Sequence, residues 1–260
     1  MPTLPKLACM ELIFGDVAGD KFEPFLAAAH AAGYAGVALR EQYLAPWYEQ
    51  PDVFRALLKE HALELAGAYQ LLTYDYVGLE KTCAFVAAQG CRDLIFYGGR
   101  AINDADRTHF FRAIEHLGGI AARHDLRASY HHHTHNFVET LTETERMLAE
   151  TDPKRVHLFV DCGHCTKDFV ELPRAERAPK FLEKNWARVS YIEFKDWSAE
   201  TDLATVVGEG EAGWPAIFKI ISERKYTGWV TVEQNAPSKG RTAAQCARAS
   251  YEFITRNWPK

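Results

Sequence analysis

The sequence lacks any apolar run close to the roughly 20 residues that a membrane-spanning helix needs. It also lacks a run of lysine and arginine, and its 35 acidic residues outnumber its 30 basic ones, for a net charge of −5. We therefore expect neither a membrane nor a nucleic acid as partner. The apolar segment 7–14 is interrupted by Glu11 and has no small-residue cleavage site, so we expect no signal peptide.

Cysteine is sparse as well. Six cysteines in 260 residues are too few for a disulfide framework, which predicts reduced thiols and a cytoplasmic location. Apolar residues make up 47% of the chain and charged residues 25%, proportions that are typical of a globular protein and exclude a disordered one. No linker or low-complexity segment divides the sequence, so we expect a single domain over residues 1–260.

Short segments rich in Val, Ile, Leu, Phe and Tyr alternate along the chain with segments of helical periodicity. Strands are predicted at 7–13, 35–40, 64–70, 92–97, 127–132, 155–161, 188–194 and 229–233. Helices are predicted at 22–32, 52–61, 79–89, 104–124, 137–150, 172–184, 215–224 and 242–257. Eight such pairs predict a single (β/α)8 TIM barrel. The alternative, a doubly wound sheet, is disfavoured because no Gly-x-Gly-x-x-Gly follows the first strand.

Residues of metal-binding types end the last four predicted strands. They are His131, Asp161, Glu193 and Glu233. Since the strands of a barrel end at one mouth, these side chains can converge on its axis. Three buried carboxylates would repel each other unless a cation neutralised them. Oxygen-rich ligands with one nitrogen suit Mn²⁺ best, with Mg²⁺, Co²⁺, Fe²⁺ and Zn²⁺ as alternatives. The competing interpretation is that each residue is merely solvated.

A histidine triplet closes the fifth predicted strand. If the strand continues through it, His131 and His133 face inward, whereas His132 faces out or packs against a helix. We take His131 as the metal ligand, and His133 and His135 as neighbours of the ligands or of a substrate. A surface cluster without function is the alternative.

The segment from Cys162 to Cys165 is a C-x-x-C sequence. Thiol exchange requires a lowered cysteine pKa, which a neighbouring carboxylate such as Asp161 opposes. A redox function is therefore disfavoured. His164, within the same segment, is a better candidate for binding substrate or transferring a proton.

The chain resembles the xylose isomerase-like TIM barrels, which include sugar isomerases and epimerases, inosose dehydratases and the endonuclease IV group. The resemblance covers essentially the whole chain, and its most specific segments are Val160-Asp161-Cys162-Gly163-His164, Phe194-Lys195-Asp196, Gly208-Glu209-Gly210-Glu211 with Trp214-Pro215, and Gly228–Glu233. In that family, strands five to eight supply Glu, Asp, His and Glu to a metal. By position these correspond to His131, Asp161, Glu193 and Glu233, so two ligands are exchanged while the charge of the set is kept.

The resemblance implies a divalent-metal-dependent enzyme of carbohydrate metabolism that removes a proton next to the carbonyl of a keto-sugar or keto-cyclitol. His131 replaces one of the two glutamate bases of the ketose epimerases, and the His-rich segment is similar to that of inosose dehydratases. This favours a dehydratase, with Glu233, His133 and His164 as catalytic residues. A ketose epimerase or an aldose-ketose isomerase is the alternative. An endonuclease IV-like nuclease and a non-catalytic sugar-binding barrel are more remote.

The substrate should lie against the mouth of the barrel, where the segments 41–51 and 196–213 are expected. The residues expected to bind it are Glu41, Trp47, Tyr69, His135 and Lys195. The expected partner is a small sugar or cyclitol, and homo-oligomerisation is left open.

Overall fold

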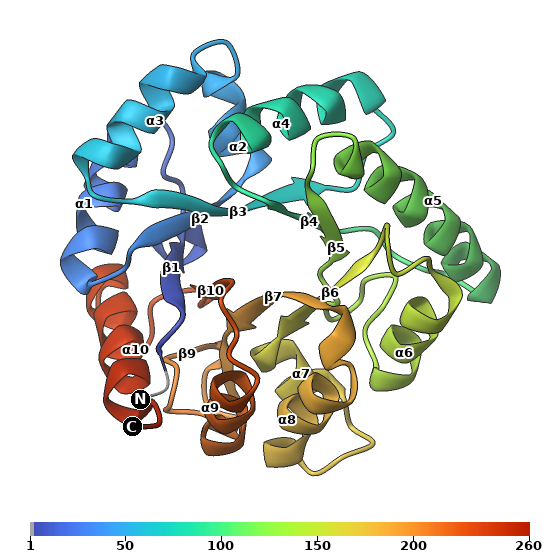
Figure 1. The fold of residues 1–260 in the computed structure, drawn as a ribbon. Coiled ribbons are helices and arrows are strands. Elements are labelled where there is room, and N and C mark those ends of the chain that lie inside the picture. Colours follow the sequence, from blue (N-terminus) through green and yellow to red (C-terminus); the bar gives the residue numbers. More distant parts are fainter. Residues whose placement is uncertain (1–2) are drawn as a thin grey trace.

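A computed structural model describes residues 3–260, and within them eight parallel strands close into a barrel surrounded by helices (Figure 1). The order around the barrel is β1-β10-β7-β6-β5-β4-β3-β2. The strands are β1 (Lys6–Met10), β2 (Gly36–Arg40), β3 (Glu64–Leu71), β4 (Asp93–Tyr97), β5 (Arg127–Tyr130), β6 (His157–Asp161), β7 (Val189–Phe194) and β10 (Trp229–Val232). The barrel closes where β1 pairs with β10, in a register that places Lys6 beside Trp229. The predicted fold class is confirmed.

The outer layer consists of helices that follow the strands in turn. They are α1 (Phe22–Ala32), α3 (Pro51–Glu60), α4 (Tyr76–Ala88), α5 (Asp104–Ala122), α6 (Leu141–Glu150), α8 (Arg174–Lys184), α9 (Trp214–Glu223) and α10 (Ala243–Asn257). Capping boxes at Asn103, Thr140 and Thr242 begin three of them, because each side chain accepts a hydrogen bond from an otherwise unpaired N–H. Of the described helices, none combines the length and apolarity needed to cross a membrane.

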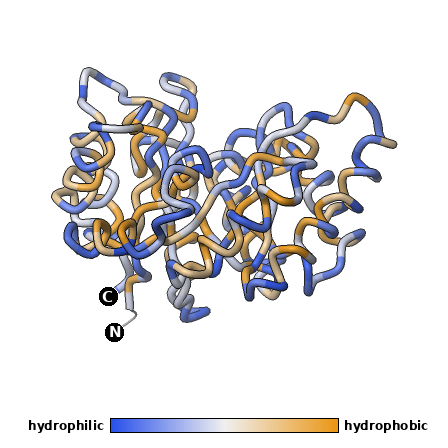
Figure 2. The backbone as a smooth tube through the Cα atoms, turned by 90° about the horizontal axis from the view of Figure 1, so that it is seen from above, coloured by the Kyte–Doolittle hydropathy of each residue, from blue (hydrophilic) through white to orange (hydrophobic). Residues whose placement is uncertain are grey.

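Two apolar layers hold the barrel together. Inside it, Met10, Tyr69, Ile95, Phe159 and Tyr191 are among the side chains that fill the centre. A larger cluster lies between the strands and the helices. Figure 2 shows hydrophilic stretches (blue) alternating with apolar stretches (orange) around the helices, as expected for helices with one buried face. The barrel centre is therefore packed with side chains.

Short elements differ from the sequence prediction. The first strand ends at Met10, because residues 11–14 turn into the 3-10 helix η1 (Glu11–Phe14). The segments expected as loops contain α2 (Glu41–Leu44), η3 (Ala45–Trp47) and the hairpin of β8 (Asp196–Ser198) and β9 (Asp202–Thr205). The helix α7 (Cys162–Asp168) was not predicted. Elements of three to seven residues are too short to show a hydrophobic period.

One buried carboxylate organises the segment between β7 and α9. The Asp196 side chain accepts hydrogen bonds from the backbone N–H groups of Trp197, Gly208, Gly210 and Ala212, and from the Trp214 indole. A Cβ atom at Gly210 would lie 2.2 Å from the Asp196 carboxylate, so only glycine fits there. The Lys-Asp and Gly-Glu-Gly-Glu motifs thus form one structural unit at the mouth of the barrel.

Replacing Asp196 by alanine should destabilise the protein by about 3 kcal/mol or more, because several buried donors lose their acceptor. Urea denaturation followed by circular dichroism measures the change. Glu200→Gln, at an exposed position of the same hairpin, is the matched control and should stay within about 0.5 kcal/mol. A loss below about 1 kcal/mol for Asp196→Ala would show that water replaces the carboxylate.

Candidate metal centre and substrate cavity

The C-terminal ends of the barrel strands open into a cavity of about 300 Å³. The residues that line it are Met10, Leu12, Arg40, Tyr69, Tyr97, His131, His133, Lys195, Glu233 and Asn235. A larger hollow of about 650 Å³ lies beside α5 and the loops after β3 and β4. It contains none of the predicted ligands, so the smaller cavity is the candidate site.

Three of the four predicted metal ligands converge beside this cavity. His131, Asp161 and Glu193 each offer one ligand atom, and these atoms lie within 4.8 Å of one another. All three side chains are buried. Asp161 Oδ2 and Glu193 Oε1 have no hydrogen-bond partner among the described residues. Buried oxygens without a donor are costly, and a divalent cation would satisfy both. The donor set therefore fits a metal ion.

The acid–base properties of the carboxylates support the same conclusion. Burial raises the pKa of Glu193 well above its usual value, and the charges of Glu233 and Asp161 raise it further. Burial also raises the pKa of Asp161 to about 6, although Lys195 acts in the opposite direction. Without a cation, the carboxylates compete to remain ionised. A divalent ion would remove this competition.

The fourth predicted ligand, Glu233, has a partner within the protein. Lys195 Nζ donates a hydrogen bond to Glu233 Oε1 and lies 4.0 Å from Asp161 Oδ2. The Lys195 side chain is only 1% exposed. Burial lowers its pKa, but the carboxylates of Glu233, Asp161 and Glu193 outweigh this, and the pKa is raised. Lys195 is thus a buried ammonium group that neutralises part of the negative charge of the site.

Three residues of the motif Val160–His164 shape the site in different ways: Asp161, Gly163 and His164. Asp161 ends β6 and caps α7, because its Oδ1 accepts a hydrogen bond from the His164 backbone N–H at 2.9 Å. Its Oδ2 remains available for a cation. Gly163 leaves room for Lys195, whose Cγ would lie 2.8 Å from a Cβ atom at that position. His164 then points its ring into the site, and its Nε2 lies 3.9 Å from Asp161 Oδ2.

The strand β5 ends at Tyr130 and does not continue through the histidine triplet, yet the three side chains point in the predicted directions. His131 and His133 line the cavity, and His133 is half-buried. His132 points away from the cavity and packs against Phe169 and Phe181. Burial lowers the pKa of His132 to about 3, so it is an uncharged core residue.

Of the residues expected to bind substrate, Tyr69 and Lys195 line the cavity. The Tyr69 hydroxyl also donates a hydrogen bond to Glu193 Oε2 at 2.5 Å, which orients this carboxylate. The other three lie outside the cavity lining. Glu41 accepts a hydrogen bond from Tyr97 at 3.3 Å. Trp47 packs against the aromatic core, and the side chain of His135 is 81% exposed.

Arg40 was missed by the sequence analysis. It is the last residue of β2, and its position at a strand end was the available signal. Its Nε donates to Glu11 Oε1 at 2.5 Å, and Glu11 is fully buried. Burial raises the pKa of Glu11 to about 7, although Arg40 acts to lower it. The pair fixes the wall of the cavity opposite the ligand strands.

The C-x-x-C cysteines are structural. Cys162 and Cys165 both lie buried in α7. Burial raises the pKa of each thiol well above its usual value, and nearby carboxylates add to the shift. The reactive thiolate is therefore disfavoured, in agreement with the sequence interpretation.

Comparisons with known proteins agree with this architecture. Among curated proteins, the inosose dehydratase of Bacillus licheniformis is 25% identical over 243 residues, which cover 84% of this chain and 77% of that protein. The solved structure of the probable 3-DHS dehydratase AsbF from Bacillus anthracis has a TM-score of 0.78 at 15% identity, covering 97% of this chain and 99% of its own. The IOLI protein with a bound zinc atom has a TM-score of 0.70 at 14% identity, covering 97% and 98%.

At such identities the solved structures establish the fold alone. The family model described as xylose isomerase-like TIM barrel matches residues 26–256. Since this match spans most of the sequence, the chain belongs to the xylose isomerase-like TIM barrel family.

Proposed function

We propose that this protein is a metal-dependent lyase that removes water next to the carbonyl of a keto-cyclitol or keto-sugar. The observation that carries the proposal is the convergence of His131, Asp161 and Glu193, with two unpartnered carboxylate oxygens, beside a cavity that also contains Lys195 and Glu233. The similarity to an inosose dehydratase supports the choice of reaction and substrate class.

His131, Asp161, Glu193 and Glu233 would hold the metal ion. The hydrogen bond from Lys195 uses Oε1 of Glu233, which leaves Oε2 for another partner. A divalent ion there would supply Lewis acidity that polarises the substrate carbonyl and acidifies the neighbouring C–H bond. Three carboxylates and one imidazole favour Mn²⁺ over softer ions. A protein of the same fold contains zinc, so a divalent ion is compatible with this scaffold.

Glu233 is the proposed base, because it lines the cavity and is held there by Lys195. His133 is the proposed acid for the leaving hydroxyl. Its Nδ1 lies 2.8 Å from the Thr134 carbonyl oxygen, which requires the hydrogen on Nδ1 and leaves Nε2 as the acceptor. Burial lowers the pKa of His133. The ring is therefore neutral at rest and must accept a proton before it delivers one. The neighbouring His164 ring is uncharged as well, so the proton would come from Glu233, which takes it from the substrate and whose charge acts on His133.

The reaction itself is tested by incubating the manganese-loaded protein with a panel of keto-cyclitols and keto-sugars in deuterated water. Mass spectrometry should show a product that has lost water. Deuterium uptake without loss of water would replace the lyase by an epimerase or isomerase. No change in any compound of the panel would contradict both and favour a binding protein.

Glu233→Gln should abolish turnover and weaken Mn²⁺ binding by roughly tenfold or more, equivalent to about 1.4 kcal/mol, because an anionic ligand is lost at nearly constant volume. Titration calorimetry on the metal-free protein measures the affinity, and thermal unfolding checks that Lys195, left without its partner, does not unfold the variant. Glu41→Gln, outside the cavity lining, is the control. Unchanged Mn²⁺ affinity would leave Glu233 as a base only.

The two exchanged ligands should be energetically coupled. His131→Glu creates a surplus buried carboxylate, and Glu193→His leaves too little negative charge for a hard cation. The double variant restores the charge of the set. It should bind Mn²⁺ better than either single variant, although turnover need not return. Single effects that simply add in the double-mutant cycle would show that the two residues do not share an ion.

A further inference from the structure

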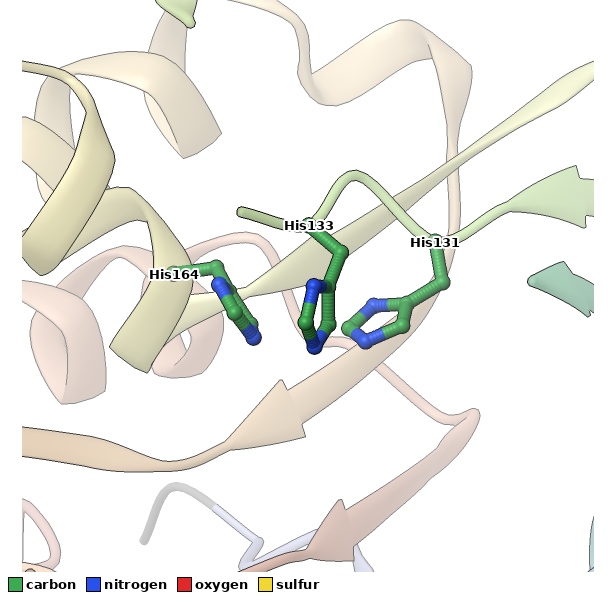
Figure 3. A group of neighbouring side chains, drawn as sticks. All are labelled: His131, His133 and His164. Carbon is green, nitrogen blue, oxygen red and sulfur yellow. The ribbon is translucent and has the colours of Figure 1, made fainter. Parts of the chain in front are cut away.

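Three imidazoles form a second group next to the oxygen-rich ligands. His131, His133 and His164 each offer a nitrogen, and these nitrogens lie within 4.8 Å of one another. The ring centres of His133 and His164 are 4.1 Å apart, and each is 5.4 Å from that of His131. Figure 3 shows the three rings side by side, with their nitrogen-bearing tips turned to the same side.

Hydrogen bonds behind two of these rings fix which nitrogen faces the group. His164 Nδ1 lies 2.9 Å from Asp168 Oδ2, and the Thr134 hydroxyl donates to the same oxygen. His133 Nδ1 faces the Thr134 carbonyl oxygen. Each acceptor requires the hydrogen on Nδ1, which leaves the Nε2 lone pair for a ligand. Metal-binding histidines are held by carboxylates and carbonyls in this way.

One of these lone pairs is buried and has no hydrogen-bond partner in the described part of the chain. His164 is fully buried, and its Nε2 has no hydrogen-bond partner there. Nitrogen acceptors that converge within 4.8 Å of one another, without a hydrogen-bond donor at the buried His164 Nε2, favour a cation between them.

We propose that His131, His133 and His164 form a nitrogen-rich position for a borderline divalent ion such as Zn²⁺, and that this position competes with the oxygen-rich one for His131. Imidazoles suit Zn²⁺, Ni²⁺ and Co²⁺, whereas carboxylates suit Mn²⁺ and Mg²⁺. The identity of the metal therefore decides which position is filled. Zn²⁺ displaces Mn²⁺ instead of binding in addition to it. The nitrogen-rich position stands by itself, and only the competition rests on the proposed function.

The two positions can be separated because each contains a ligand that the other lacks. His133→Gln should weaken Zn²⁺ binding at least tenfold and change Mn²⁺ affinity less than twofold. Glu193→Gln should weaken Mn²⁺ binding at least tenfold and change Zn²⁺ affinity less than twofold. His135→Gln, an exposed histidine two residues away, is the matched control and should change neither. Titration calorimetry on the metal-free full chain gives the affinities, and electron paramagnetic resonance should detect one Mn²⁺ released for each Zn²⁺ added.

Asp168→Asn provides a second test that keeps all three rings. Loss of the carboxylate behind His164 should reduce Zn²⁺ affinity by roughly 10–100-fold, and should alter the visible spectrum of bound Co²⁺. If Glu193→Gln weakens Zn²⁺ binding while His133→Gln and Asp168→Asn leave it intact, Zn²⁺ uses the oxygen-rich position and the inference is overturned. Zn²⁺ binding that depends on His133, in a protein that binds no Mn²⁺, would contradict the proposed function and retain the inference.

Discussion

The repulsion between three carboxylates, buried together at one end of a closed barrel, is the interaction on which the rest of the site depends. Asp161, Glu193 and Glu233 end three strands that are adjacent in the barrel, so the backbone brings them together whatever their charge. Their hydrogen-bond donors include the Lys195 ammonium group, the Tyr69 phenol and the backbone N–H of His164. Within residues 3–260, Asp161 Oδ2 and Glu193 Oε1 are still left without a hydrogen-bond partner. A cation would neutralise this excess of buried negative charge.

The scaffold around the site resists the relaxation that would relieve this repulsion. Asp161 is anchored by the hydrogen bond that caps α7. The segment that follows Lys195 is fixed by the Asp196 carboxylate through five N–H groups. Arg40 and Glu11 pair on the opposite wall. The proposed ligands thus lie at or directly after strand ends that are supported by buried hydrogen bonds, which is the arrangement that preserves a metal geometry.

The structure shows a consequence of the proposed exchange of a glutamate and a histidine between the fifth and seventh barrel strands. The histidine at position 131 lies beside His133 and His164, so the exchange places a third imidazole next to two others. The negative charge of the oxygen-rich set is retained, and a nitrogen-rich set is created alongside. On the proposed assignment, two ion positions with different chemical preferences would share His131 as a ligand.

The sequence by itself determined the barrel and the residues at its mouth. Alternation of strands and helices follows from hydrophobic periodicity, and parallel strands of a barrel must end at one rim. His131, Asp161 and Glu193 could therefore be grouped without coordinates. Only the tertiary structure decided that Lys195 pairs with Glu233, that Arg40 joins Glu11, and that Trp47 and His135 lie away from the cavity. Such contacts join residues 29 to 38 positions apart and leave no periodic signal in the sequence. They depend on the directions of single side chains and on short elements such as α7, which only the tertiary structure shows.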